Sequence, residues 1–178
     1  WTLAKDPARA ARAQELALEV EPGSAGAFTG LRTYYEETEQ AGKLAKLLRH
    51  RLQYESDSEA ADELRVAFAE ACLVTGERAR AKTSLAEILR KNPNHLPALA
   101  LLGTLSAEDR EWRRAEALWL RLRDLYPRGE TRTNLLRDLA QLYEHATRDL
   151  PAAEAVIGDL LAECPESDEP REALVRIS

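Results

Sequence analysis

The feature that most constrains this chain is a pattern that returns after 34 residues. Four positions between residues 69 and 93 have counterparts 34 positions later, and each pair matches in size or type. The pairs are Ala69 and Gly103, Ala81 and Ala115, Leu85 and Trp119, and Pro93 and Pro127. A recurrence of this length indicates an array of one small structural unit, in which each copy packs on the next.

The repeated unit is predicted to be helical. Ala and Leu, both strong helix formers, supply most of the apolar residues, and the alternation of apolar and polar residues that a sheet needs is absent. Proline breaks such as Asn92-Pro93-Asn94 separate the apolar stretches, and Ser56 with Glu59 resembles a capping box. We expect helices at roughly 7–20, 25–39, 42–54, 58–75, 78–91, 96–107, 111–125, 131–146, 150–163 and 170–177.

The copy from Leu96 to Gly129 resembles the tetratricopeptide repeat, a paired-helix unit of about 34 residues. Leu102-Gly103 is similar to the Leu-Gly of that family's first helix, Trp112 to the aromatic residue that opens its second helix, and Pro127 to its closing proline. The resemblance implies an all-α chain, a right-handed α-solenoid of stacked antiparallel helix pairs with about four repeats and a partial repeat at each end. A related family with repeats of about 36–38 residues stays open as an alternative.

We expect one solenoid domain over residues 1–178. Its repeats are placed at approximately 1–24 (partial), 25–57, 58–95, 96–129, 130–166 and 167–178 (partial). Leu44 precedes Ala81 by 37 positions and Ala115 precedes Ala153 by 38, and we interpret both longer spacings as small loop insertions.

The small residues are predicted to set the distance between the two helices of a repeat. Ala69 or Gly103 on the first helix is expected to face Ala81 or Ala115 on the second. Small side chains at a crossing let two helices approach to the short end of the usual distance of about 8–10 Å.

The resemblance also implies a concave groove lined by the first helices. Half of the residues at groove positions are acidic, and an apolar strip lies among them. They are Glu36, Glu37, Glu63, Val66, Glu70, Leu73, Val74, Thr104, Glu108, Arg137, Gln141 and Glu144. A protein or peptide partner with basic or amphipathic character would complement such a surface.

Charge argues against nucleic acid as the partner. The chain has a formal net charge of −6, whereas nucleic-acid affinity comes from Lys and Arg that neutralise phosphates. One local cluster is basic, and its members are Arg110, Arg113, Arg114, Arg121 and Arg128. We interpret this cluster as a solvated outer face, since exposed aromatic residues for base stacking do not accompany it.

The sequence gives little support for catalysis, a metal or a cofactor. The three histidines, His50, His95 and His145, are scattered, and Cys72 and Cys164 lie far apart without metal-ligand spacing. Glycine-rich phosphate loops and membrane-spanning apolar runs are missing. We therefore expect no enzyme activity, no cofactor, no metal site and no membrane insertion.

Two functional hypotheses follow. The first is a scaffold that binds a partner protein segment in the groove, and the second is a structural or self-associating module within a larger assembly, because open solenoid ends expose apolar surface. An RNA-reading repeat is a third and weaker hypothesis. The richness in Ala, Leu and Arg suggests a bacterial protein, the start at Trp1 and the lack of Met suggest a fragment of a longer chain, and the compartment stays open, with the cytoplasm favoured over the periplasm.

Overall fold

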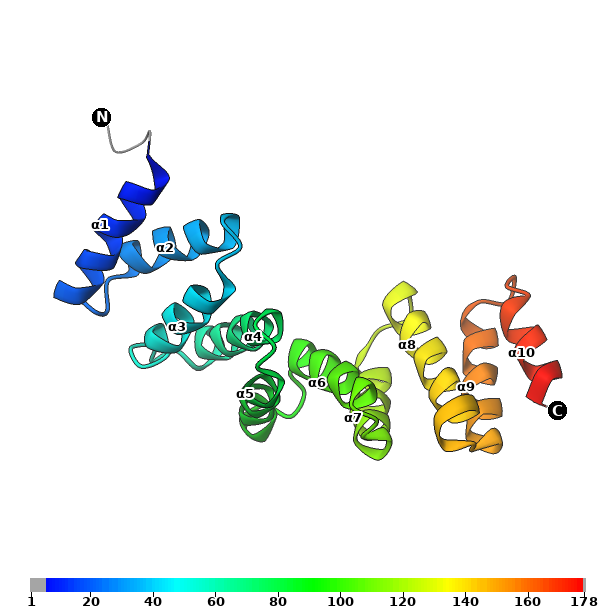
Figure 1. The fold of residues 1–178 in the computed structure, drawn as a ribbon. Helices are drawn as coiled ribbons and strands as arrows, with labels where there is room; N and C mark the ends of the chain where they lie inside the picture. The colour runs from blue at the N-terminus through cyan, green and yellow to red at the C-terminus, as the bar shows by residue number, and fades with distance from the viewer. Residues whose placement is uncertain (1–5, 178) are drawn as a thin grey trace. The chain divides into compact units, whose positions relative to one another are not determined.

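The structure is a computed structural model that describes residues 6–177. Trp1 and the four residues after it, together with Ser178, lie outside this range, so the outer parts of the two expected partial repeats are not described. Residues 6–177 form ten α-helices and one short π-helical segment, and no strand (Figure 1). The prediction of an all-α chain is confirmed.

The helices fall into two compact units, divided between Lys91 and Asn92. The first unit contains α1 (Pro7–Val20), α2 (Ala25–Glu37), α3 (Ala41–Arg51), α4 (Ser58–Val74) and α5 (Arg78–Lys91). The second contains α6 (Leu96–Glu108), α7 (Trp112–Leu125), α8 (Glu130–Gln141), the π-helical segment η2 (Leu142–Thr147), α9 (Leu150–Glu163) and α10 (Glu169–Ile177). The single domain and the repeat bounds expected from the sequence remain predictions.

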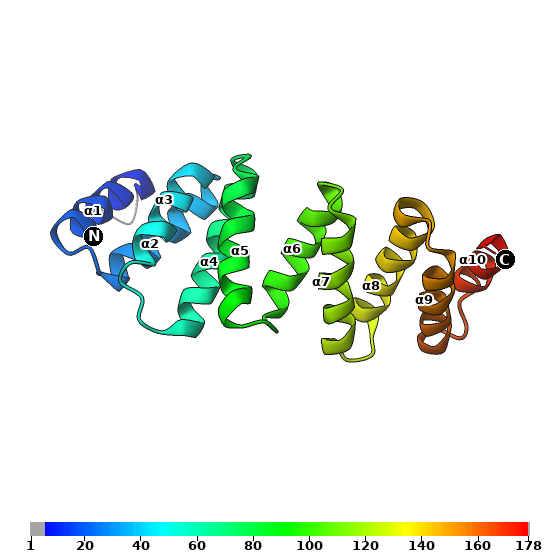
Figure 2. The ribbon, with the colours of Figure 1, turned by 90° about the horizontal axis from the view of Figure 1, so that it is seen from below.

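Within each unit, every helix packs against the next one along the chain. Both views show α4 beside α5, and α6 beside α7 (Figures 1 and 2). We call α2, α4, α6 and α8 the first helices, and α3, α5, α7 and α9 the second helices. This succession of neighbours is the packing that a helical repeat requires, because one helix pair cannot bury its apolar face alone.

Side-chain caps determine where several helices begin. Asp57 Oδ1 accepts hydrogen bonds from the backbone N–H groups of Glu59 at 2.8 Å and Ala60 at 3.1 Å, so Asp57, and not Ser56, caps α4. His95 Nδ1 accepts from the backbone N–H of Ala98 at 3.2 Å, which gives this histidine a structural role at the start of α6. Such caps satisfy backbone donors that have no partner inside the helix.

The small residues of the second helices occupy equivalent places. Ala81, Ala115 and Ala153 are each the fourth residue of their helix, and each has an exposed fraction of 0%. The side chain one helical turn further on is large and buried in all three helices, as Leu85, Trp119 and Ile157. The register inferred from the sequence is therefore present in the second helices.

The partner of Gly103 differs from the one we expected. A Cβ atom at Gly103 would lie 2.5 Å from Nε1 and 2.6 Å from Cδ1 of Trp119, so the glycine faces the indole ring and not Ala115. The preceding repeat has Ala69 and Leu85 at the corresponding positions. A smaller residue on the first helix thus accompanies a larger one on the second, which keeps the packed volume similar.

We expected loop insertions to lengthen two of the repeats, but the structure places the extra residues within helices. Helices α2 and α6 have 13 residues each, whereas α4 has 17, and α8 continues for six further residues as η2. Buried Ser106 precedes Ala115 by nine positions, but buried Tyr143 precedes Ala153 by ten. One of the four extra residues of this repeat falls within η2, because a π-helical turn holds one residue more than an α-helical turn.

Ala115→Leu should overpack the crossing between α6 and α7. We expect the substitution to lower the free energy of unfolding by about 1–3 kcal/mol, because Ala115 is fully buried and its neighbours leave no room for three more carbons. Ala117→Leu on the same helix is the matched control, since Ala117 is exposed. Urea unfolding followed by circular dichroism measures both, and equal stability of the two variants would contradict the assigned register.

The contact between Gly103 and Trp119 predicts a coupled pair of substitutions. Gly103→Ala adds about 1 kcal/mol of helix propensity, but its methyl group would overlap the indole, so we expect a net loss of stability. In a Trp119→Leu background the space resembles that beside Ala69 and Leu85, and the same change should be neutral or stabilising. A double-mutant cycle of unfolding free energies measures the coupling. An identical effect of Gly103→Ala in both backgrounds would rule out the contact as its cause.

Candidate functional site

One face of α4 carries five of the residues predicted to line a groove. At about 100° per residue, Glu63, Val66, Glu70, Leu73 and Val74 fall within an arc of about 100°. The two glutamates are exposed, Val66 and Leu73 are half-buried, and Val74 is 77% exposed. Among residues 6–177, neither Glu63 nor Glu70 forms an ion pair. The face therefore combines accessible apolar surface with two carboxylates that have no counter-charge.

The predicted groove residues of α2 and α6 are also exposed. Glu36 and Glu37 lie at the end of α2, and Glu36 Oε1 pairs with Arg32 Nε at 2.7 Å. Thr104 and Glu108 lie one turn apart on α6. The exposed pair on α2 contributes little stability, because water screens both charges.

The structure gathers Arg137, Gln141 and Glu144 around one hollow of about 410 Å³. The hollow lies between α8 with η2 on one side and α10 on the other. Ile157 and Leu160 of α9 form part of its apolar lining, and Ala173 and Arg176 belong to the wall from α10. The hollow thus has the components of a side-chain pocket, with apolar groups surrounded by polar ones.

Glu144 differs from the open acidic residue that we expected. Its side chain is 6% exposed, and Arg176 Nη2 donates hydrogen bonds to both carboxylate oxygens, at 2.9 Å to Oε1 and 2.8 Å to Oε2. His145 Nε2 lies 3.6 Å from Oε2. The negative charge of Glu144 is therefore already compensated within the chain, so it adds little to the acidity of this surface.

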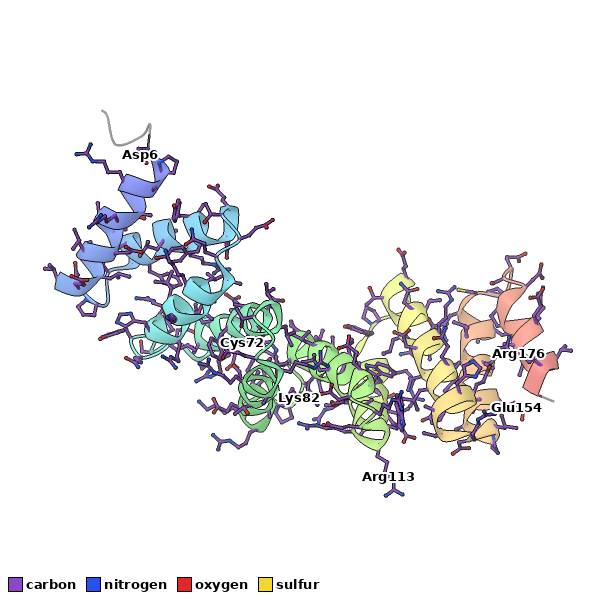
Figure 3. All side chains as sticks on the ribbon, viewed as in Figure 1. Asp6, Cys72, Lys82, Arg113, Glu154 and Arg176 are labelled. Atoms are coloured by element: carbon purple, nitrogen blue, oxygen red, sulfur yellow. The ribbon has the colours of Figure 1, made fainter. Side chains whose placement is uncertain are left out.

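The arginines of the basic cluster are exposed. Arg114 pairs with Glu111 at 3.3 Å, and Arg121 Nε donates to Asn94 Oδ1 at 3.0 Å. The side chain of Arg113 extends away from α7 (Figure 3). This arrangement agrees with a solvated outer face.

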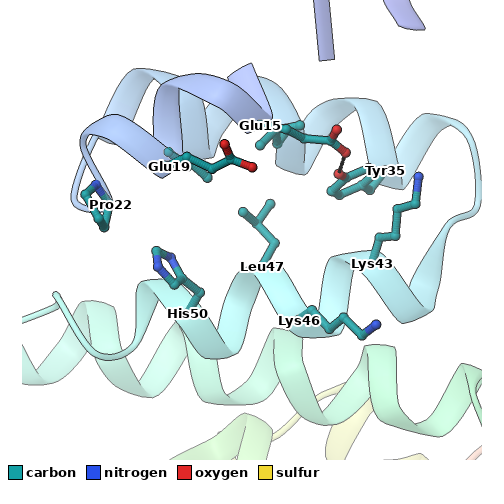
Figure 4. Close-up of a pocket in the computed structure, with 10 residues that line it drawn as sticks. Glu15, Glu19, Pro22, Tyr35, Lys43, Lys46, Leu47 and His50 are labelled. Atoms are coloured by element: carbon teal, nitrogen blue, oxygen red, sulfur yellow. Dashed lines mark hydrogen bonds between the residues drawn. The ribbon is translucent and has the colours of Figure 1, made fainter. Parts of the chain in front are cut away.

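A further hollow, of about 530 Å³, lies among α1, α2 and α3 (Figure 4). Glu15 and Glu19 of α1 lie along one side, Lys43, Lys46 and His50 of α3 lie along the other, and Leu47 lies between them. Sequence reasoning missed this hollow, because its charged side chains come from α1 and α3, which the predicted groove does not include. The opposite charges of the α1 and α3 side chains were visible in the sequence, but their common hollow depends on tertiary packing.

Comparison with known proteins identifies the fold. No protein-family model matches the chain, and no curated protein matches it. Among solved structures, YrrB, described as a TPR protein with an unusual peptide-binding site, is 15% identical, with a TM-score of 0.68 over 96% of this chain and 84% of that one. The chain has the tetratricopeptide-repeat fold.

Two other structures support this assignment. The C-terminal part of a TPR repeat-containing protein from Cytophaga hutchinsonii is 12% identical, with a TM-score of 0.70 over 99% of this chain and 67% of that chain. A thermophilic TPR protein of Thermus thermophilus is 20% identical, with a TM-score of 0.54 over 93% of this chain and 89% of that chain. At these identities the likeness shows the tetratricopeptide-repeat fold alone.

Tyrosine–glutamate hydrogen bonds join adjacent repeats of the tetratricopeptide-repeat fold. Tyr35 Oη of α2 donates to Glu15 Oε1 of α1 at 2.5 Å, and Tyr143 Oη of η2 donates to Glu116 Oε1 of α7 at 2.8 Å. Burial and, secondarily, the hydrogen bond to the glutamate raise the pKa of both tyrosines above their ordinary value. Each bond ties its tyrosine to a helix that comes earlier in the chain.

The described residues offer no metal site and no membrane span. Residues 6–177 contain no group of three or more His, Cys, Asp or Glu side chains arranged to hold a metal ion. In the same range, every helix is too short or too polar to cross a bilayer. Burial raises the pKa of the Cys72 thiol, which disfavours the reactive thiolate form.

The two tyrosines predict a loss of stability in alkaline solution. In the unfolded chain they ionise near pH of about 10, whereas the folded chain keeps them protonated, so unfolding releases protons and stability falls as pH rises. Tyr35→Phe with Tyr143→Phe should make this decline shallower. Unfolding free energies measured between about pH 9 and about pH 11 test the slope. Tyr54→Phe, which changes an exposed ring, should keep the wild-type slope, and an unchanged slope in the double variant would contradict the prediction.

Proposed function

We propose that this chain is a scaffold that binds a segment of a partner protein on the exposed faces of its first helices, which the resemblance assigns to the concave groove. The observation that carries the proposal is the face of α4 defined by Glu63, Val66, Glu70, Leu73 and Val74. Its valines and leucine leave apolar surface accessible to a partner, and its two glutamates have no ion pair in the described chain. Exposed apolar surface edged by charge is typical of interaction sites.

The chemistry of this face favours a basic, amphipathic partner. A helix whose apolar stripe covers Val66 and Leu73 would bring its flanking Lys or Arg side chains toward Glu63 and Glu70. Unlike charges of this kind steer association and select the partner. YrrB, which is similar in fold, is described as having a peptide-binding site, and that description agrees with a peptide-sized ligand.

The hollow lined by Arg137 and Gln141 offers a second contact of the same kind. Its apolar lining from α9 and α10 is suited to one apolar side chain of a bound segment. Because Glu144 is compensated by Arg176, this hollow should select for shape and hydrogen bonding more than for positive charge.

Self-association is the second candidate function, and α1 provides the observation that favours it. Leu16 and Val20 lie one turn apart on α1 and are 56% and 87% exposed. Two copies of the chain that covered these residues would bury apolar surface. Light scattering over a range of protein concentrations measures the mass of the particle.

A peptide-binding experiment tests the α4 face. The probe is a fluorescein-labelled amphipathic helical peptide of Leu and Lys, and its control is the same peptide with Gln in place of every Lys. We expect the Lys peptide to bind more tightly than the Gln peptide. Glu70→Lys or Leu73→Asp should weaken binding of the Lys peptide about tenfold, which corresponds to about 1.4 kcal/mol. Fluorescence anisotropy at moderate salt gives the dissociation constants.

Glu154→Lys is the matched charge control, because Glu154 is exposed on α9 and the substitution changes the net charge by the same amount. It should leave binding of the Lys peptide unchanged. Equal weakening by Glu154→Lys would mean that only net charge matters, and binding that survives both α4 substitutions would reject the face. A concentration-dependent mass in light scattering, without peptide binding, would favour self-association instead.

A further inference from the structure

Three arginines from three successive helices meet at one hollow in the first unit. The hollow has a volume of about 430 Å³, and Arg49 of α3, Arg65 of α4 and Arg80 of α5 all line it. Leu52, directly after α3, and Phe68 of α4 supply apolar lining, and Glu87 is the only acidic residue among the lining residues described. We call this hollow the arginine pocket.

The arginine pocket holds positive charge that the chain only partly compensates. Arg65 pairs with Asp62 at 3.0 Å and lies 3.8 Å from Glu87, and Arg80 pairs with Glu77. Arg49 is exposed, and no ion pair to it is found within residues 6–177. The neighbouring acids can thus offset Arg65 and Arg80, whereas the charge of Arg49 remains open to a ligand.

Composition does not explain this concentration of arginines. Residues 15–75, which contain Arg49 and Arg65, carry twice as many acidic as basic residues. The packing of α3, α4 and α5 is what brings the three side chains together. The guanidinium of Arg80 also lies over the ring of Phe68, 5.4 Å from its centroid, which holds it at the pocket.

The arginine pocket is separate from the face of α4 discussed above. With about 100° per residue, Arg65 and Phe68 point to the side of α4 opposite Glu70 and Val74. Occupation of one surface therefore leaves the other accessible, and the two surfaces favour ligands of opposite charge.

We propose that the arginine pocket binds a carboxylate side chain of an acidic segment in a partner protein. The guanidinium groups would donate hydrogen bonds to the carboxylate, and an apolar side chain next to it in the segment would lie on Leu52. A protein carboxylate is favoured over nucleic acid for two reasons. The chain as a whole is acidic, and the aromatic ring at the pocket is buried and covered by Arg80, so it is not free to stack on a base.

Direct binding to the whole chain tests the proposal. The probe is a fluorescein-labelled peptide of Leu and Glu, and the control peptide has Gln in place of every Glu. We expect the Glu peptide to bind, the Gln peptide to bind more weakly, and added salt to reduce the difference. Arg49→Gln and Arg80→Gln should each weaken the Glu peptide by roughly fivefold, as expected for the loss of one exposed charge pair.

Arg113→Gln is the matched control, because Arg113 is exposed and extends away from α7 in the second unit (Figure 3). It should leave binding of the Glu peptide unchanged. No binding of the Glu peptide, or equal weakening by Arg113→Gln, would overturn the proposal. Arg49 is exposed and unpaired within residues 6–177, so Arg49→Gln should fold normally even if Arg80→Gln disturbs the contact with Phe68.

Two further measurements separate this site from its alternatives. Glu70→Lys should leave binding of the Glu peptide undiminished. An error in the proposal for the α4 face would therefore appear with the Lys peptide, and an error in the proposal for the arginine pocket would appear with the Glu peptide. Inorganic phosphate and a single-stranded RNA are added as competitors. If either displaces the Glu peptide at a lower concentration than unlabelled Glu peptide does, the ligand is a phosphate and the assignment to a protein carboxylate is wrong.

Discussion

The crossing between the two helices of a repeat is the interaction on which the other features depend. Ala81, Ala115 and Ala153 are buried without exception, and a large side chain follows each of them one turn later. Once this crossing fixes how a second helix rotates against its first helix, it also fixes which residues of the first helix face outward. The exposed face of α4 is therefore a consequence of the packing on its opposite side.

The repeat, the all-α fold and most helix ends could be predicted from the sequence, because small residues, large residues and prolines recur at one spacing. The side chain that lies against Gly103 could not be predicted in this way. Ala115 and Trp119 are one turn apart on the same face of α7, and spacing alone does not tell which of them lies opposite the glycine. The segment η2 was missed for a similar reason, since one inserted residue has the same effect on spacing whether it lies in a loop or in a π-helical turn.

The exposure of the residues on the α4 face could be predicted from the sequence, but the ion pairing of Glu144 could not. Glu63 and Glu70 are exposed, as the helical register implied, because exposure of a helix face depends on local periodicity. Glu144 was expected to add to the acidic surface, yet it is paired with Arg176, which is 32 positions away in the chain. A salt bridge between helices depends on how side chains meet in three dimensions, and neither residue type nor spacing within one helix reveals it.

Helix α4 shows how one element can present two different surfaces. Its buried residues hold it between α3 and α5, which leaves one exposed face and, on the opposite side, a hollow between the three helices. The exposed face carries glutamates and valines, and the hollow is lined by Arg65 and Phe68 together with arginines of α3 and α5. Because the same packing positions both surfaces, a substitution that rotated α4 would alter both together, whereas a substitution at an exposed position would alter only one. The two surfaces can therefore be tested independently only through their exposed residues.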